Sequence, residues 1–85
     1  MNLSELERLK EIRILQRASV DKHEQDQLEA EREEIVRKIR LIPHRHRVIL
    51  ELYYDKLLTW KEVSEAMQLD LRYIYRIRKE LITGD

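Results

Sequence analysis

Between residues 59 and 81 the chain reads Thr59-Trp-Lys-Glu-Val-Ser-Glu-Ala-Met-Gln-Leu-Asp-Leu-Arg-Tyr-Ile-Tyr-Arg-Ile-Arg-Lys-Glu-Leu81, and this stretch decides the predicted fold. Its apolar positions, which stand four, two, five and three residues apart, are Val63, Met67, Leu69, Ile74 and Ile77. No single helix or strand produces those separations, but one helix ending at Met67, a turn anchored by Leu69 and a second helix do. The pattern predicts two short amphipathic helices that share a small core.

Residues with capping and turn preferences support this division. Thr59 and Glu62 have the spacing of a capping box, in which each side chain accepts a hydrogen bond from a free backbone N–H at the helix start. Asp70 stands where the second helix needs an N-cap, and Ser64 is small enough for a close helix crossing. Gln68 occupies the corner, where glycine is usual because the backbone there tends to need positive φ. We therefore predict that Gln68 is tolerated at this corner in place of glycine, at some energetic cost.

The second predicted helix, from Leu71 to Ile82, turns Ile74, Ile77 and Leu81 inward. Its outer arc carries basic and aromatic side chains: Arg72, Tyr73, Tyr75, Arg76 and Lys79. Residues 71–82 hold four basic residues and one acidic residue, a formal charge of +3 in a chain whose net charge is zero. Positive charge is therefore expected to be concentrated on this helix.

A cationic helix of this kind fits the major groove of duplex DNA. Arg72 and Arg76, one turn apart, are the candidates for base reading, because a guanidinium can form two hydrogen bonds with guanine. The tyrosines and lysines are better placed for phosphates, which fix register without reading sequence. The predicted DNA-binding residues are Lys61, Leu71, Arg72, Tyr73, Tyr75, Arg76 and Lys79. The alternative is that these are ordinary solvated side chains on a pair of helices.

A wider pattern is formed by Pro43, Val48, Leu50, Leu52, Tyr53, Tyr54, Thr59, Trp60, Glu62, Val63, Leu69, Ile74, Tyr75, Arg76 and Ile77. It resembles region 4 of bacterial sigma factors and the small phage transcription regulators built on it, over about the last half of the chain. Gln68 and Leu71 depart from the family pattern, and because of Leu71 the resemblance does not imply which bases are recognised. The resemblance implies binding to promoter-type duplex DNA, a contact with RNA polymerase, a phage or mobile-element origin, and activation rather than repression.

Length and composition limit the other classes of function. With 85 residues, of which 40% are charged, one is glycine and one is proline, the chain is expected to be all-α and too small for a deep substrate cleft. We therefore predict that it is no enzyme and needs no cofactor. The absence of cysteine and of a long apolar run leads us to expect a soluble, cytoplasmic protein without membrane contact.

The first 42 residues form a second predicted part, with nine basic and ten acidic residues. Its apolar residues fall on two narrow helical stripes: Leu3, Leu6, Leu9, Ile12 and Leu15, then Leu28, Ile35, Ile39 and Ile42. Capping boxes at Ser4 and Asp21 predict helices from about Ser4 to Arg17 and from Asp21 to Ile42, with a bend near Ser19. A single continuous helix is the alternative.

Such stripes are typical of a coiled-coil seam. They could close on each other as a hairpin, on the C-terminal part, or on a second copy of the protein. We favour a homodimer or higher oligomer formed through residues 1–42, because specific DNA sites are commonly read by two-fold dimers. The chain is thus divided into an assembly arm, residues 1–42, and a three-helix helix-turn-helix domain, residues 43–85.

Several residues suggest other chemistry that we set aside. His44 and His46 point to different sides of a helix, and no third ligand follows, so no metal site is predicted. The carboxylates of residues 31, 33 and 34 lack a pocket or nucleophile and read as a solvated helix face. Trp60 is expected in the core against Leu52 and Ile77, joined by either Tyr53 or Tyr54, with the other tyrosine at the surface.

The predicted function is therefore that of a sequence-specific, duplex-DNA-binding transcription regulator. Two alternatives belong to other classes. A phage small terminase subunit would form a ring of many copies, which light scattering separates from a dimer. A helical adaptor of the transcription machinery would bind protein and no DNA.

Overall fold

A computed structural model describes residues 3–81, apart from the side chains of residues 45 and 81. Its elements are α1 (Leu3–Ala18), α2 (Lys22–Ile39), α3 (His44–Leu50), the π-helix η1 (Glu51–Asp55), α4 (Trp60–Met67) and α5 (Leu71–Leu81). The described part of the chain is helical and contains no strand, as the composition predicts. No helix within it has both the length and the apolar character needed to cross a membrane. The last residue of the predicted reading helix, Ile82, lies outside the described residues.

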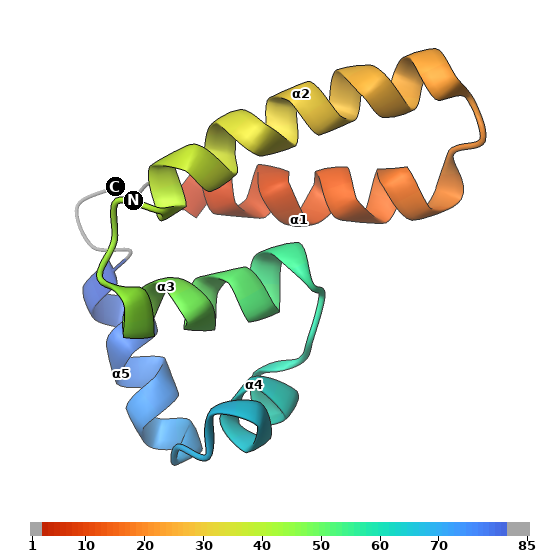
Figure 1. Ribbon diagram of the computed structural model, residues 1–85. Helices are drawn as coiled ribbons and strands as arrows, with labels where there is room; N and C mark the ends of the chain where they lie inside the picture. Colours follow the sequence, from red (N-terminus) through yellow and green to blue (C-terminus); the bar gives the residue numbers. More distant parts are fainter. Residues whose placement is uncertain (1–2, 82–85) are drawn as a thin grey trace.

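The helices stack in three layers (Figure 1). Helices α1 and α2 run antiparallel, side by side, and form the first layer. Helix α3 and η1 follow one another as the middle layer, with α1 packed on η1. Helix α4 and the start of α5 form the third layer, on the side of α3 that faces away from α1 and α2, and α5 then runs past α3 toward the end of α2. The N-terminal helix pair, α1 and α2, therefore lies opposite the start of α5.

The first core joins the N-terminal helix pair to the middle layer. Its buried members are Leu6, Leu9, Ile12, Leu28, Ile35, Val36, Ile39, Leu50 and Tyr54. Most of the two predicted stripes are thus buried against each other, and Leu50 and Tyr54 complete the core from beyond residue 42. Among the residues of the predicted stripes, Leu15 and Ile42 are partly buried at the edge of this core.

The second core joins the middle layer to α4 and α5. Ile49, Val63, Ile74 and Ile77 are buried there, with 0 to 2% of each residue exposed. Met67 and Leu69 pack at its edge, as the sequence predicts. Because Ile49 faces this core while its neighbour Leu50 faces the first, α3 is held from both sides.

The bounds of the N-terminal helices differ slightly from the predicted ones. Helix α1 already includes Leu3, so Ser4 lies inside the helix and is not its N-cap. Asp21 does cap α2, where its carboxylate accepts a hydrogen bond from the N–H of His23 at 2.9 Å. Helix α2 ends at Ile39, three residues before the predicted Ile42, because the chain turns toward Pro43. Proline disfavours helical geometry in the residue before it.

The middle layer widens into a π-helix at its end. The N–H of Lys56 donates to the carbonyl of Glu51 at 2.9 Å, a bond that spans five residues instead of four. Leu57 then adopts a left-handed conformation with φ of 62°, and the N–H of Leu58 reaches back to the carbonyl of Leu52 at 3.0 Å. This reversal ends the helix and directs the chain into α4.

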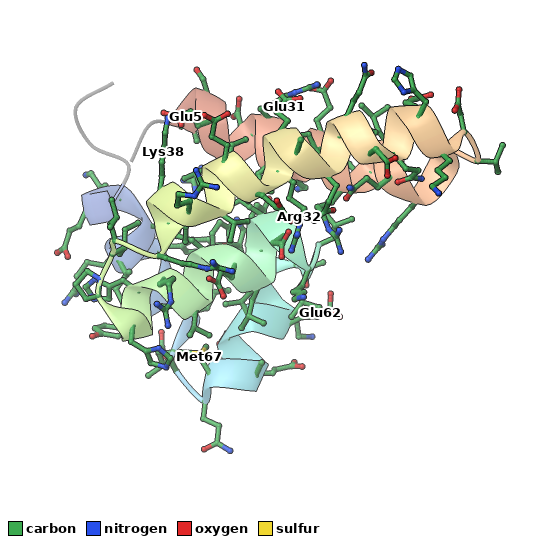
Figure 2. The ribbon with its side chains drawn as sticks, turned by 45° about the horizontal axis from the view of Figure 1, so that its top comes forward. Glu5, Glu31, Arg32, Lys38, Glu62 and Met67 are labelled. Carbon is green, nitrogen blue, oxygen red and sulfur yellow. The ribbon has the colours of Figure 1, made fainter. Side chains whose placement is uncertain are left out.

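A buried carboxylate at the end of η1 ties three helices together. Asp55 is 4% exposed, and Arg32 of α2 donates to its two oxygens at 2.8 and 2.9 Å. Arg13 of α1 donates to the backbone carbonyl of Asp55 at 3.0 Å and lies 3.4 Å from its carboxylate. Figure 2 shows Arg32 pointing from α2 toward the middle layer. This network, which the sequence analysis did not foresee, we call the Asp55 cluster: Arg13, Arg32 and Asp55.

The Asp55 cluster changes the acidity of its members. Burial acts to raise the pKa of Asp55, but the hydrogen bonds and positive charge of Arg32, with Arg13 nearby, outweigh burial and hold that pKa below its ordinary value. The pKa of Arg32 is raised in return, chiefly by its hydrogen bonds to Asp55. The carboxylate therefore stays ionised in the folded protein at neutral pH.

We expect Asp55 to contribute acid sensitivity to folding. A carboxylate whose pKa is lower in the folded than in the unfolded chain adds stability above its unfolded pKa, near 4, and loses it as pH falls through the folded value. The difference in unfolding free energy between wild type and Asp55→Asn should therefore shrink as pH is lowered below about 4. Urea titrations at a series of pH values measure it; a difference that stays constant would contradict this assignment.

Candidate nucleic-acid interface

Helix α4 begins with the predicted capping box. The N–H of Glu62 donates to the hydroxyl of Thr59 at 3.1 Å, and the N–H of Thr59 donates to the carboxylate of Glu62 at 3.0 Å. The hydrogen bond from the backbone of Thr59 lowers the pKa of Glu62. Both groups are exposed. The box fixes where α4 starts and leaves the side chain of Lys61 in its first turn exposed.

The corner between α4 and α5 has the backbone that the sequence analysis expected. Gln68 is left-handed, with φ of 54° and ψ of 42°, which is costly for a residue with a side chain. The N–H of Leu69 donates to the carbonyl of Ser64 at 3.0 Å and closes the turn. The hydroxyl of Ser64 also donates to the carbonyl of Leu69. Ser64 thus holds both sides of the corner, beyond the small size for which it was singled out.

Helix α5 presents its cations to solvent. Asp70 caps the helix, because its carboxylate accepts from the N–H of Arg72 at 2.8 Å. The side chains of Arg72, Arg76 and Lys79 are exposed, and none has an ion pair or side-chain hydrogen bond within residues 3–81. Lys61 is likewise exposed and unpaired within that range. The described structure thus brings four of the predicted cations to the surface.

The apolar and aromatic residues among the predicted contacts differ in exposure. Tyr75 is 48% exposed, and the edge of its ring meets Trp60 with centroids 6.1 Å apart. Leu71 and Tyr73 are half-buried, and Tyr73 packs at the edge of the second core. Tyr73 therefore packs α5 against the second core, and only part of its side chain is accessible to a ligand.

Arg78 lies apart from the other basic residues of α5. Its guanidinium lies over the ring of Trp60, 5.6 Å from the centroid, and the Nε atom is buried without a hydrogen-bond partner among the described residues. Burial raises the pKa of the Tyr54 hydroxyl, while the nearby guanidinium of Arg78 partly offsets the increase. Arg78 therefore contributes to packing, and the outer face of α5 carries three of the four basic residues counted from the sequence.

Aromatic side chains connect α5 to the N-terminal helix pair. Trp60 stacks on Tyr53, with centroids 3.8 Å apart and rings 10° from parallel. The ammonium group of Lys10, from α1, lies 4.3 Å from the centroid of the Tyr53 ring and donates to the Tyr53 hydroxyl at 3.1 Å. Trp60 is half-buried and packs on the second core that contains Ile77. Tyr54 is the fully buried tyrosine, and Tyr53 lies between both cores instead of at the surface.

The residues set aside for other chemistry have structural partners or face solvent. Arg8 donates to both oxygens of Glu31 at 2.9 Å, so this carboxylate joins α1 to α2 and is not merely solvated. His44 is exposed, with its Nδ1 atom 2.7 Å from the guanidinium of Arg47. Within the described residues, no group of three His, Cys, Asp or Glu side chains could hold a metal ion.

Comparison of the chain with family models, with curated proteins and with solved structures finds no match. The likeness to sigma factor region 4 therefore rests on the residues of this chain alone.

Proposed function

We propose that the chain is a sequence-specific, duplex-DNA-binding transcription regulator. In this proposal α3, α4 and α5 act as a helix-turn-helix unit, and α5 enters the major groove with Arg72 and Arg76 against base edges. Lys61, Tyr75 and Lys79 contact the phosphates on either side of the groove.

The exposed, unpaired cations of α5 carry this proposal. In the N-terminal helix pair, four cations are instead neutralised by carboxylates: Arg8, Arg13, Arg32 and Lys38. Arg72, Arg76 and Lys79 lack such partners within residues 3–81. Figure 1 shows the start of α5 on the side of the molecule opposite α1 and α2, where these helices do not cover it. Cations held in that way are available to neutralise phosphates.

Assembly through residues 1–42 stays a prediction, with a restricted geometry. Leu6, Leu9 and Ile12 are fully buried within one chain. A dimer made through the same stripe would therefore have to exchange helices between copies. A contact that leaves each chain closed would use the charged outer faces of α1 and α2.

Replacement of Arg76 by alanine should reduce sequence discrimination. A guanidinium bound to one base pair contributes about 1–3 kcal/mol of preference for it. The affinity of Arg76→Ala for its selected site should fall by that amount, while its affinity for random duplex DNA changes little more than expected for the loss of one charge. Fluorescence anisotropy with both duplexes measures the two affinities, after selection of the site from a random pool.

Lys79→Ala is the matched control, because it removes one exposed cation from the same helix without removing a base contact. It should weaken both duplexes alike and flatten the salt dependence of binding. Equal effects of the two substitutions on selected and random DNA would refute the assigned roles. Failure of the wild type to bind duplex DNA at low salt would favour the alternative of a protein-binding adaptor.

A further inference from the structure

The longest acid-free stretch of the chain lies outside the proposed recognition helix. Residues 35–50 contain five basic residues, two histidines and no acidic residue. They form the end of α2, the turn after it and the whole of α3. The expectation that positive charge is concentrated on α5 is therefore incomplete, because this segment carries a larger formal charge.

Two arginines of this segment have no neutralising partner. The side chains of Arg37 and Arg40 are exposed and make no ion pair or hydrogen bond within the described range, 3–81. Lys38, between them, pairs with Glu5 at 2.7 Å, and Figure 2 shows these two side chains close to one another. Arg47 is held by His44 and lies 3.8 Å from Glu51. Arg37 and Arg40 are thus the free cations of this segment whose side chains the structure describes.

Arg37 and Arg40 share one surface feature. They line a depression of about 310 Å³ on α2, together with the buried Val36, the already paired Arg32 and the single carboxylate of Glu33. Two unpaired guanidiniums against one carboxylate leave the depression positively charged. Guanidinium groups that line a common depression match the geometry of phosphate oxygens.

The depression runs along α2 from Arg32 to Arg40, and its Arg40 end lies at the end of the molecule where α5 also ends. Figures 1 and 2 both place the end of α2 beside the C-terminal end of α5. Helix α3, which follows directly, packs on α5. An 11-residue helix is about 16 Å long, and the long axis of the molecule is 40 Å. The end of α2 thus lies about one length of α5 from the start of the helix that is proposed to enter the groove.

We propose that Arg37 and Arg40 form a second phosphate-contact surface, which binds the backbone of the same duplex beyond the groove that α5 enters. This inference rests on the proposed function. It extends the footprint of a small DNA-binding unit by means of α2, a helix outside the recognition pair. The surface reads no bases, so it strengthens binding to all sequences alike.

The double variant Arg37→Gln/Arg40→Gln tests this surface. Its control is Arg17→Gln/Lys22→Gln, which removes the same charge at the far end of the helix pair, where both side chains are exposed and unpaired within the described chain (Figure 1). Binding of each protein to a fluorescent random-sequence duplex longer than 40 Å is followed by anisotropy over a salt series. Thermal melting confirms that both variants remain folded.

Each phosphate contact adds about 0.9 to the slope of log affinity against log salt. The slope should therefore fall by about 1.8 in Arg37→Gln/Arg40→Gln and stay at the wild-type value in the control. Between about 50 and 200 mM salt, the wild type should lose about tenfold more affinity than the test variant. If the two arginines only stabilise the C-terminal end of α2, Arg37→Gln/Arg40→Gln should melt at a lower temperature but keep the wild-type slope.

The outcomes separate this inference from the proposed function. Equal slopes for the two double variants would overturn the second surface and leave α5 as the DNA-binding element. Salt-independent binding, or no binding, by the wild type would overturn both proposals. A duplex shortened to the groove that α5 occupies should bind wild type and test variant equally; a persistent difference on that short duplex would also overturn the second surface.

Discussion

Replacement of Asp55 by alanine should cost about 3 kcal/mol of unfolding free energy, the lower end of the range for breaking a buried ion pair. The cost arises because Arg32 and Arg13 keep their charges while the carboxylate between them disappears. The low end applies because Arg32 retains Glu29 at 2.6 Å and its side chain is 20% exposed. Urea denaturation followed by circular dichroism measures the loss.

Lys56→Ala is the appropriate control for this substitution. Lys56 follows Asp55 directly and lies 3.9 Å from its carboxylate, but its side chain is 59% exposed. Exposed ion pairs contribute about 0–1 kcal/mol, so Lys56→Ala should change stability little. An Asp55→Ala protein as stable as Lys56→Ala would mean that the Asp55 cluster does not hold the N-terminal helix pair to η1.

The Asp55 cluster also shows where prediction from sequence ends. Arg32 and Asp55 are 23 residues apart, and each also has a partner nearer in sequence, Glu29 for Arg32 and Lys56 for Asp55. Spacing along the chain therefore does not indicate that they pair. The capping box of Thr59 and Glu62 was predicted because its two members lie three residues apart and interact within one helical turn. Interactions within one turn can be read from spacing, whereas pairing between helices depends on how they pack.

The candidate interface was also predictable only in part, since the exposed face of α5 follows from the sequence and the contacts between helices do not. Helical periodicity placed Arg72 and Arg76 on the exposed face of α5, as the structure has them. Arg78 follows the buried Ile74 by four residues, so its position on the core side of the helix could have been inferred from the same periodicity. Its contact with Trp60 could not, because a long arginine side chain can cover apolar surface while its Cα lies at the edge of the core. The unpaired state of Arg37 and Arg40 likewise required the positions of all neighbouring carboxylates.

The largest effect of all is expected from Ile74→Asp, which should leave no folded protein. Ile74 is fully buried in the second core, among the apolar side chains of Ile49, Val63 and Ile77. Burial of an unpaired charge is far more costly than loss of a hydrogen bond, and the total stability of a domain is only about 5–15 kcal/mol. Circular dichroism and the emission of Trp60, the single tryptophan, should both report an unfolded chain.

Two further substitutions show whether burial is the cause. Arg76→Asp places the same residue two positions later on the exposed face, and it should fold while losing DNA binding. Ile74→Val removes one methylene and should cost about 0.5–1.5 kcal/mol without loss of binding. If Ile74→Asp melted at the wild-type temperature, that result would contradict the packing of α5 against α3 and α4.

Unfolding caused by Ile74→Asp should extend to the N-terminal helix pair. Ile49 packs in the second core and Leu50 in the first, so α3 cannot leave one core without disturbing the other. Tyr53 and Trp60 also pack against both cores. Hydrogen exchange should therefore show that the amides of α1 and α2 lose protection together with those of α5. If α1 and α2 kept their protection, the N-terminal helix pair would be a separate folding unit, and the Asp55 cluster would be a contact between two units instead of part of one.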